Sequence, residues 1–101
     1  MSEGDPDKCA DRISDRILDA FLERDPTSRV ACETMLADQC VIVAGEFKTK
    51  HSEDYEAVRA SAEGLVRAVL RETGYRSAAT GIDADQCEVQ IRFNGQSADI
   101  N

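Results

Sequence analysis

The chain has 101 residues, of which 42% are hydrophobic, and it carries a formal net charge of −8 at pH 7. This length predicts one small domain with a single core, most economically helices packed on a sheet. The acidic balance argues against a nucleic-acid or anionic-membrane surface, because both partners require basic patches. No apolar run approaches about 18 residues and the N-terminus is acidic, so we expect no membrane span and no signal peptide.

The N-terminal stretch from Glu3 to Lys8 places three carboxylates and one ammonium within six residues. One interpretation is an acidic helix cap with Pro6 in the first turn, which is a common arrangement. The other is a binding site, because carboxylates attract Mg²⁺ while a lysine and a helix N-terminus attract phosphate. The spacing alone favours the cap, and both interpretations stay open at this point.

The first helix is predicted from apolar residues that recur at spacings of three and four over residues 9–22. It should begin at Pro6 and end near Arg24. Its apolar stripe is typical of a core face. Asp25 precedes Pro26 and is therefore disfavoured in helical conformation, so a turn follows.

Two strands are predicted next. Apolar and polar residues alternate over residues 29–36, and a continuous apolar run over residues 40–44 predicts a strand covered on both faces and ended by Gly45. Their closeness in sequence predicts an antiparallel hairpin, which places Glu33 and Glu46 on neighbouring strands. Each of these glutamates could be an ordinary solvated residue of the sheet, especially Glu46, which we expect near the strand end.

A second helix and a third strand complete the predicted fold. An apolar stripe over residues 55–70 predicts a helix closed by Gly74, and alternation over residues 87–93 predicts a strand ended by Asn94 and Gly95. The expected fold class is therefore α+β, a two-layer sandwich with two helices on one face of a small, mainly antiparallel sheet.

The cysteines and the single histidine suggest no metal centre or disulfide framework. No two cysteines form a CxxC pair, and each lies within an apolar pattern, which is typical of buried free thiols in a cytosolic protein. The sequence places no nucleophile beside His51, so we interpret it as a surface loop residue. The four cysteines are Cys9, Cys32, Cys40 and Cys87.

Several motifs run through the chain in order. They are Ser2-Glu3-Gly4-Asp5-Pro6-Asp7-Lys8-Cys9-Ala10-Asp11-Arg12-Ile13-Ser14-Asp15, then Asp25-Pro26, Arg29 to Thr34, Ala44-Gly45-Glu46, Gly74-Tyr75, Gly81-Ile82-Asp83 and Gln96 to Ile100. The set resembles the S-E-G-H-P-D-K-I-A-D-x-I-S-D, D-P-x-x-R-V-A-C-E-T, [AG]-G-E, I-G-Y, G-F-D and Q-S-P-D-I segments of S-adenosylmethionine synthetase (methionine adenosyltransferase). Residues 1–101 are thus similar to one domain of that family, its N-terminal domain.

The resemblance implies an activity and a set of site residues. The family converts ATP, L-methionine and water into S-adenosylmethionine, phosphate and diphosphate, using Mg²⁺ and commonly K⁺. By resemblance, Asp7 would bind Mg²⁺, Lys8 would contact the polyphosphate and Glu33 would lie at the K⁺ site. Glu46 and Gln96 would contact methionine, and Gln96 would also begin a mobile loop that gates the site.

Four departures from the family pattern accompany the resemblance. Asp5 stands where the family has a histidine beside the ATP phosphates, and a carboxylate there would repel the leaving triphosphate. The family's preceding strand, L-F-T-S-E-S-V, and its central and C-terminal domains fall outside residues 1–101. The stretch between Glu46 and Gly74 is longer than usual by about two helical turns, and Ala98 replaces a proline.

Three interpretations stay open on the sequence. The chain is a piece or isolated domain of a synthetase that is inactive alone, a non-catalytic paralogue that binds or regulates a complete synthetase, or an acidic α+β domain without a ligand. The family's sites lie between subunits that pack through flat sheet faces. We therefore expect a homo-oligomer or association with a complete synthetase.

Overall fold

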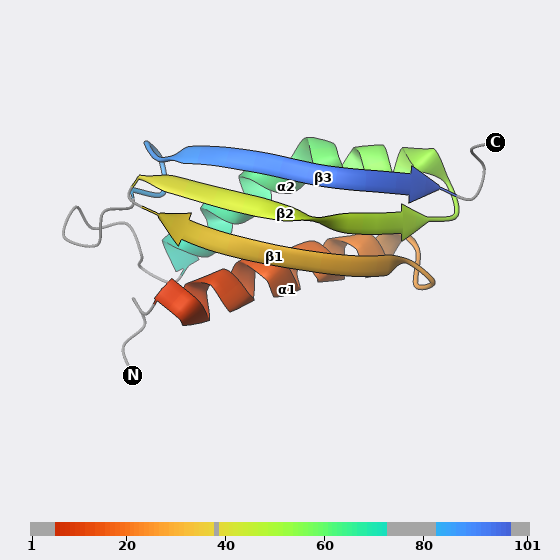
Figure 1. The fold of residues 1–101 in the computed structure, drawn as a ribbon, viewed down its shortest axis with the longest axis horizontal. Helices are drawn as coiled ribbons and strands as arrows, with labels where there is room; N and C mark the ends of the chain where they lie inside the picture. The colour runs from red at the N-terminus through yellow and green to blue at the C-terminus, as the bar shows by residue number, and fades with distance from the viewer. Residues whose placement is uncertain (1–5, 38, 73–82, 98–101) are drawn as a thin grey trace.

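The computed structural model describes residues 6–37, 39–72 and 83–97, with only the backbone of Pro6, Asp7, Gln96 and Ser97. The elements follow in the order α1 (Pro6–Arg24), β1 (Arg29–Ala37), β2 (Cys40–Thr49), α2 (Ser52–Glu72) and β3 (Glu88–Ser97). Both helices lie behind one face of the sheet (Figure 1). The predicted two-layer α+β architecture is confirmed. Among the described residues, no helix is long and apolar enough to cross a membrane.

The sheet has the strand order β1-β2-β3. β1 and β2 form the predicted antiparallel hairpin, with Arg29 opposite Lys48 at one end and Ala37 opposite Cys40 at the other. β3 pairs with the other edge of β2 in parallel. A parallel neighbour requires a long crossover connection, and α2 lies within that connection.

Two strands continue beyond their predicted ends. β2 runs on through Gly45 and Glu46, and β3 runs on through Asn94 and Gly95. The prediction that these glycines end the strands is therefore wrong. A Cβ atom on Gly95 would overlap the ring of Tyr55, so this glycine allows α2 to pack closely on β3.

The core lies between the helices and one face of the sheet. An aromatic cluster lies at the end of the core where α1 ends and α2 begins: the ring centroids of Phe21 and Phe47 are 4.6 Å apart, and those of Phe47 and Phe93 are 4.3 Å apart. Burying each large apolar side chain contributes about 1.5–3 kcal/mol. The buried apolar residues are Cys9, Ile13, Ile17, Phe21, Val41, Val43, Phe47, Val58, Ala62, Val66, Val69, Leu70, Ala84 and Cys87.

Asp25 joins two connections at one end of the sheet. Its carboxylate accepts hydrogen bonds from the Thr27 amide at 2.9 Å, the Thr27 hydroxyl at 2.6 Å and the Lys50 amide at 2.9 Å. The residue is only 6% exposed. These bonds, chiefly the one from the Thr27 hydroxyl, lower the pKa of Asp25 from 3.8 to about 2.

We predict that this carboxylate makes the stability of the fold depend on acidity. Because its folded-state pKa lies below its unfolded value, its stabilisation is complete above about pH 4 and is lost as the pH falls through about 2. Asp25→Asn should lower the melting temperature at pH 7 by roughly 5 °C, and the difference from the wild type should shrink towards pH 2. Circular dichroism melts across this range, with the exposed Asp19→Asn as control, measure the effect. A difference independent of pH would contradict it.

Candidate functional site

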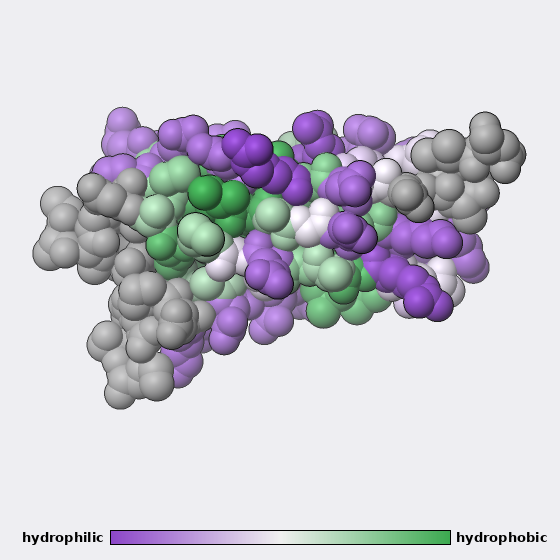
Figure 2. Space-filling model, in the orientation of Figure 1, coloured by the Kyte–Doolittle hydropathy of each residue, from purple (hydrophilic) through white to green (hydrophobic). Residues whose placement is uncertain are grey.

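The sheet face opposite the helices is open. In the part of the chain that the structure describes, no element covers it, and Figure 2 shows apolar and polar side chains mixed across it. Met35 is 62% exposed there. Strand alternation turns the nine residues of the three central rows towards this face, and Arg29 and Lys48 lie on the same side in an outer row. The nine residues are Ala31, Glu33, Met35, Ile42, Ala44, Glu46, Gln90, Arg92 and Asn94.

The apolar run of β2 therefore has only one of its faces covered by described residues of this chain. Val41 and Val43 face the helices and are fully buried, whereas Ile42 and Ala44 lie on the open face and are half-buried. Sequence alone predicted cover on both faces. Ile42 and Ala44 thus place apolar side chains, which a second layer usually covers, in the middle of an otherwise mixed open face.

Glu33 and Glu46 both lie on the open face. Glu33 is opposite Ala44, while Glu46 is opposite Ala31 in β1 and Asn94 in β3. The two glutamates are therefore diagonal neighbours, whose Cα atoms in such a sheet lie about 7–8 Å apart. Their predicted position on neighbouring strands is confirmed. The expectation that Glu46 lies near a strand end is wrong, because β2 continues to Thr49.

A hollow of about 320 Å³ surrounds Glu46. Two further hollows, of about 350 and 420 Å³, adjoin Glu33. Sequence reasoning missed three polar residues of the hollow around Glu46: Arg29, Lys48 and Asn94. The register of the hairpin could have revealed Arg29 and Lys48, whereas Asn94 depends on the extension of β3. The residues that line this hollow are Arg29, Val30, Ala31, Glu46, Phe47, Lys48 and Asn94.

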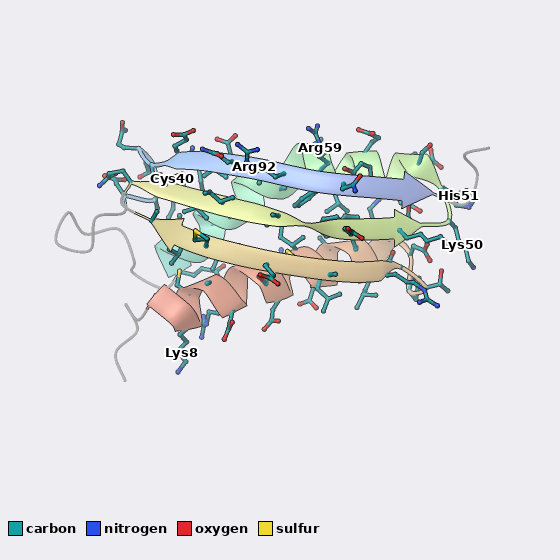
Figure 3. All side chains as sticks on the ribbon, viewed as in Figure 1. Lys8, Cys40, Lys50, His51, Arg59 and Arg92 are labelled. Atoms are coloured by element: carbon teal, nitrogen blue, oxygen red, sulfur yellow. The ribbon has the colours of Figure 1, made fainter. Side chains whose placement is uncertain are left out.

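The start of α1 lies far from Glu46 (Figure 3). Lys8 is exposed in the first turn of α1, and Figure 3 shows it at the end of the molecule opposite to Lys50 and His51, which follow β2. Within one chain, the structure does not bring Lys8 together with Glu46. Asp5 lies outside the described residues, as does the side chain of Asp7.

Gln96 is described only by its backbone, which pairs with Lys48. Its backbone therefore lies two residues along the sheet from the row of Glu46 and Asn94. His51 is exposed between β2 and α2, as the sequence predicted.

The donors fit the cations that the resemblance implies, but only as single ligands. Within residues 6–37, 39–72 and 83–97, no group of three His, Cys, Asp or Glu residues is arranged to hold a metal. Mg²⁺ and K⁺ take oxygen ligands, and Mg²⁺ usually keeps waters and substrate phosphates among them. Glu33 offers one carboxylate, and a hydrogen bond of 2.8 Å between the hydroxyls of Ser14 and Thr34 holds its strand against α1.

Gly45 lets β1 and β2 approach each other beside Glu46. A Cβ atom at this position would overlap the carbonyl oxygen of Ala31 and lie 3.0 Å from Cα of Cys32. Both are backbone atoms, so β1 itself would have to move. The glycine thereby helps to fix the position of the following glutamate.

We predict that Gly45→Ala lowers the free energy of unfolding by about 1–3 kcal/mol, because the added methyl group displaces β1. Urea unfolding measures the loss, and amide chemical shifts of Ala31 and Glu46 report the displacement. Gly64→Ala is the matched control, because the Cβ atom would meet nothing within 4 Å on α2; this change should stabilise by up to about 1 kcal/mol. Equal effects of the two substitutions would contradict the prediction.

Comparison with known proteins gives one family and one curated relative. Residues 1–98 match the family described as S-adenosylmethionine synthetase, N-terminal domain. The S-adenosylmethionine synthase of Mesoplasma florum is 46% identical over 100 residues, which cover 99% of this chain and 25% of that protein. The chain therefore spans about a quarter of the length of this curated relative.

Proposed function

Because the chain belongs to the family of S-adenosylmethionine synthetase N-terminal domains, we propose that it supplies this domain's part of a synthetase active site. The reaction would join the adenosyl group of ATP to the sulfur of L-methionine. The observation that carries the proposal is the position of Glu46, exposed in a hollow of about 320 Å³ on the open sheet face.

Glu46 would bind the ammonium group of L-methionine. Its carboxylate projects from the middle of a paired strand, where neighbours on both sides fix its backbone. A carboxylate is the natural partner of an ammonium, and the resulting bond is charge-assisted. Gln96, whose backbone lies two residues along the sheet from that row, would complete the contacts with methionine.

Residues at the start of α1 would hold the triphosphate of ATP. Lys8 supplies an ammonium and Asp7 a carboxylate for Mg²⁺, which when bound neutralises charge on the phosphates. Glu33 would contribute an oxygen to a K⁺ site. These residues hold and orient the nucleotide, so that the sulfur of methionine can approach the carbon of the adenosyl group.

Two copies would be needed to unite these residues. Lys8 lies at the end of the molecule opposite to Lys50 (Figure 3), and Glu46 lies in the second half of β2, the strand that ends just before Lys50. If the open faces of two copies pack with their strands in opposite directions, the start of α1 in one copy comes close to the end of β2 in the other. A site between subunits, formed with a second copy or a complete synthetase, follows from this arrangement.

A cytoplasmic location is part of the proposal. None of the four cysteines forms a disulfide bond, and Cys9 and Cys87 are buried. Burial is the largest influence on the Cys32 and Cys87 thiols and raises the pKa of each. Unreactive, reduced thiols of this kind suit a reducing compartment.

The activity is tested with the chain alone and in a chimera. The chain alone should form no S-adenosylmethionine from ATP and L-methionine with Mg²⁺ and K⁺. In the chimera, it replaces the matching quarter of the Mesoplasma florum synthase. We expect Asp5→His to raise the chimera's rate by roughly 10²-fold or more, because a carboxylate at that position repels the triphosphate.

The controls separate the outcomes. Glu46→Gln in the Asp5→His chimera should raise the KM for methionine, whereas Asp19→Asn should leave the rate unchanged. A folded Asp5→His chimera without activity would overturn the synthetase role and favour the second candidate, a non-catalytic module that binds a complete synthetase. The presence of Asp5 is the observation that favours this second candidate. Product from the chain alone would contradict its inactivity in isolation.

We also predict self-association through the open face. Met35→Lys should shift the chain towards monomer in multi-angle light scattering, because it places a charge in an apolar contact. Ala60→Lys, an exposed position on α2, is the matched control and should leave the distribution unchanged. A wild-type chain that is a clean monomer at high concentration would count against this interface.

A further inference from the structure

Two cations face each other directly at the end of the hairpin. Arg29 in β1 is the register partner of Lys48 in β2, and both are exposed. The Cβ atoms of two residues in such a pair lie about 4.5–5.5 Å apart. Like charges in this position destabilise a sheet unless an anion lies between them.

The described part of this acidic chain provides no such anion. Neither Arg29 nor Lys48 forms an ion pair there, and neither bonds to Glu46. Three other arginines are paired with carboxylates: Arg24 with Asp54 at 3.3 Å, Arg67 with Glu63 at 2.9 Å and Arg71 with Asp85 at 2.6 Å. Among the described residues, the cation pair therefore has no anionic partner.

The pair borders the hollow that contains Glu46. Glu46 lies one row along the same face, about 7 Å away along the strand. Ala31, the residue opposite Glu46, is small and leaves room between the strands. The hollow thus has an anionic side and a cationic side on neighbouring rows of one face, so that one small zwitterion can contact both.

We propose that Arg29 and Lys48 form a carboxylate subsite, so that this hollow binds the α-amino acid zwitterion by both of its charged groups. The guanidinium of Arg29 can grip a carboxylate with two parallel hydrogen bonds, and Lys48 adds a point charge. Glu46 accepts the ammonium of the same molecule. The inference rests on the proposed function and assigns the substrate's second charged group to two residues.

The test is an amide chemical-shift titration of the ¹⁵N-labelled chain at low ionic strength. L-Methionine is compared with 3-(methylthio)propylamine, which lacks the carboxylate, and with tripolyphosphate. Arg29→Gln/Lys48→Gln should weaken methionine binding by roughly tenfold or more, because charged hydrogen bonds are lost. The amine should bind the wild type and the double variant with equal affinity, and Glu46→Gln should weaken the binding of both methionine and the amine.

Arg12→Gln/Lys50→Gln is the control, because it removes the same charge from exposed positions outside the hollow. Methionine binding retained by the Arg29/Lys48 double variant but lost in Glu46→Gln would overturn this inference alone. If the Arg29/Lys48 double variant also bound the amine more weakly to the same extent, the inference would be overturned, because the effect would be one of general charge. The same holds if the control variant weakened methionine binding equally. Tripolyphosphate displacing methionine in the wild type would assign the cations to phosphate and overturn it as well. No response of the wild type to methionine would overturn both this inference and the role of Glu46.

Discussion

The fold depends on one aromatic cluster that joins both helices to the sheet. Phe21 of α1 stacks on Phe47 of β2, and Phe47 also packs on Phe93 of β3. Tyr55 of α2 lies 6.3 Å from Phe21, measured between ring centroids. Large rings bury much apolar area and fix relative orientation, so this cluster holds both helices against the same side of the sheet.

That one-sided packing decides where a ligand or partner can bind. The helices use the apolar stripe of each strand that points towards them, and the opposite stripe stays available. Glu33 and Glu46 lie on the available side among small or flexible neighbours such as Ala31, Ala44 and Met35. Charged groups there can change with function while the core remains intact, since alternate residues of a strand belong to different faces.

Periodicity predicted most of the fold because each helix and the first strand bury a single face. The ends of β2 and β3 were predicted too early because Gly45 and Gly95 are glycines. A glycine that ends a strand and a glycine that admits a close neighbour have the same appearance in sequence. Only the packing of Tyr55 on Gly95, and of Ala31 on Gly45, distinguishes them.

The residues of the candidate site could be predicted only where the sequence also predicted how the strands pair. Glu33 and Glu46 follow from the hairpin and the family motifs, whereas Asn94 needed the full length of β3. Arg29 and Lys48 are far apart in sequence and resemble ordinary surface cations. Their proposed role depends on their being register partners on neighbouring strands, and no local sequence pattern reveals that pairing.

The parallel pairing of β3 has a consequence for synthesis of the chain. The hairpin of β1 and β2 is local and can form as soon as Thr49 has left the ribosome. The second edge of β2 must wait for Glu88 and the residues after it, because β3 pairs there only after α2. During this interval, an apolar strand edge is exposed, which is the usual starting point of aggregation. The long α2 therefore sets the time for which a nascent chain depends on its surroundings to remain soluble.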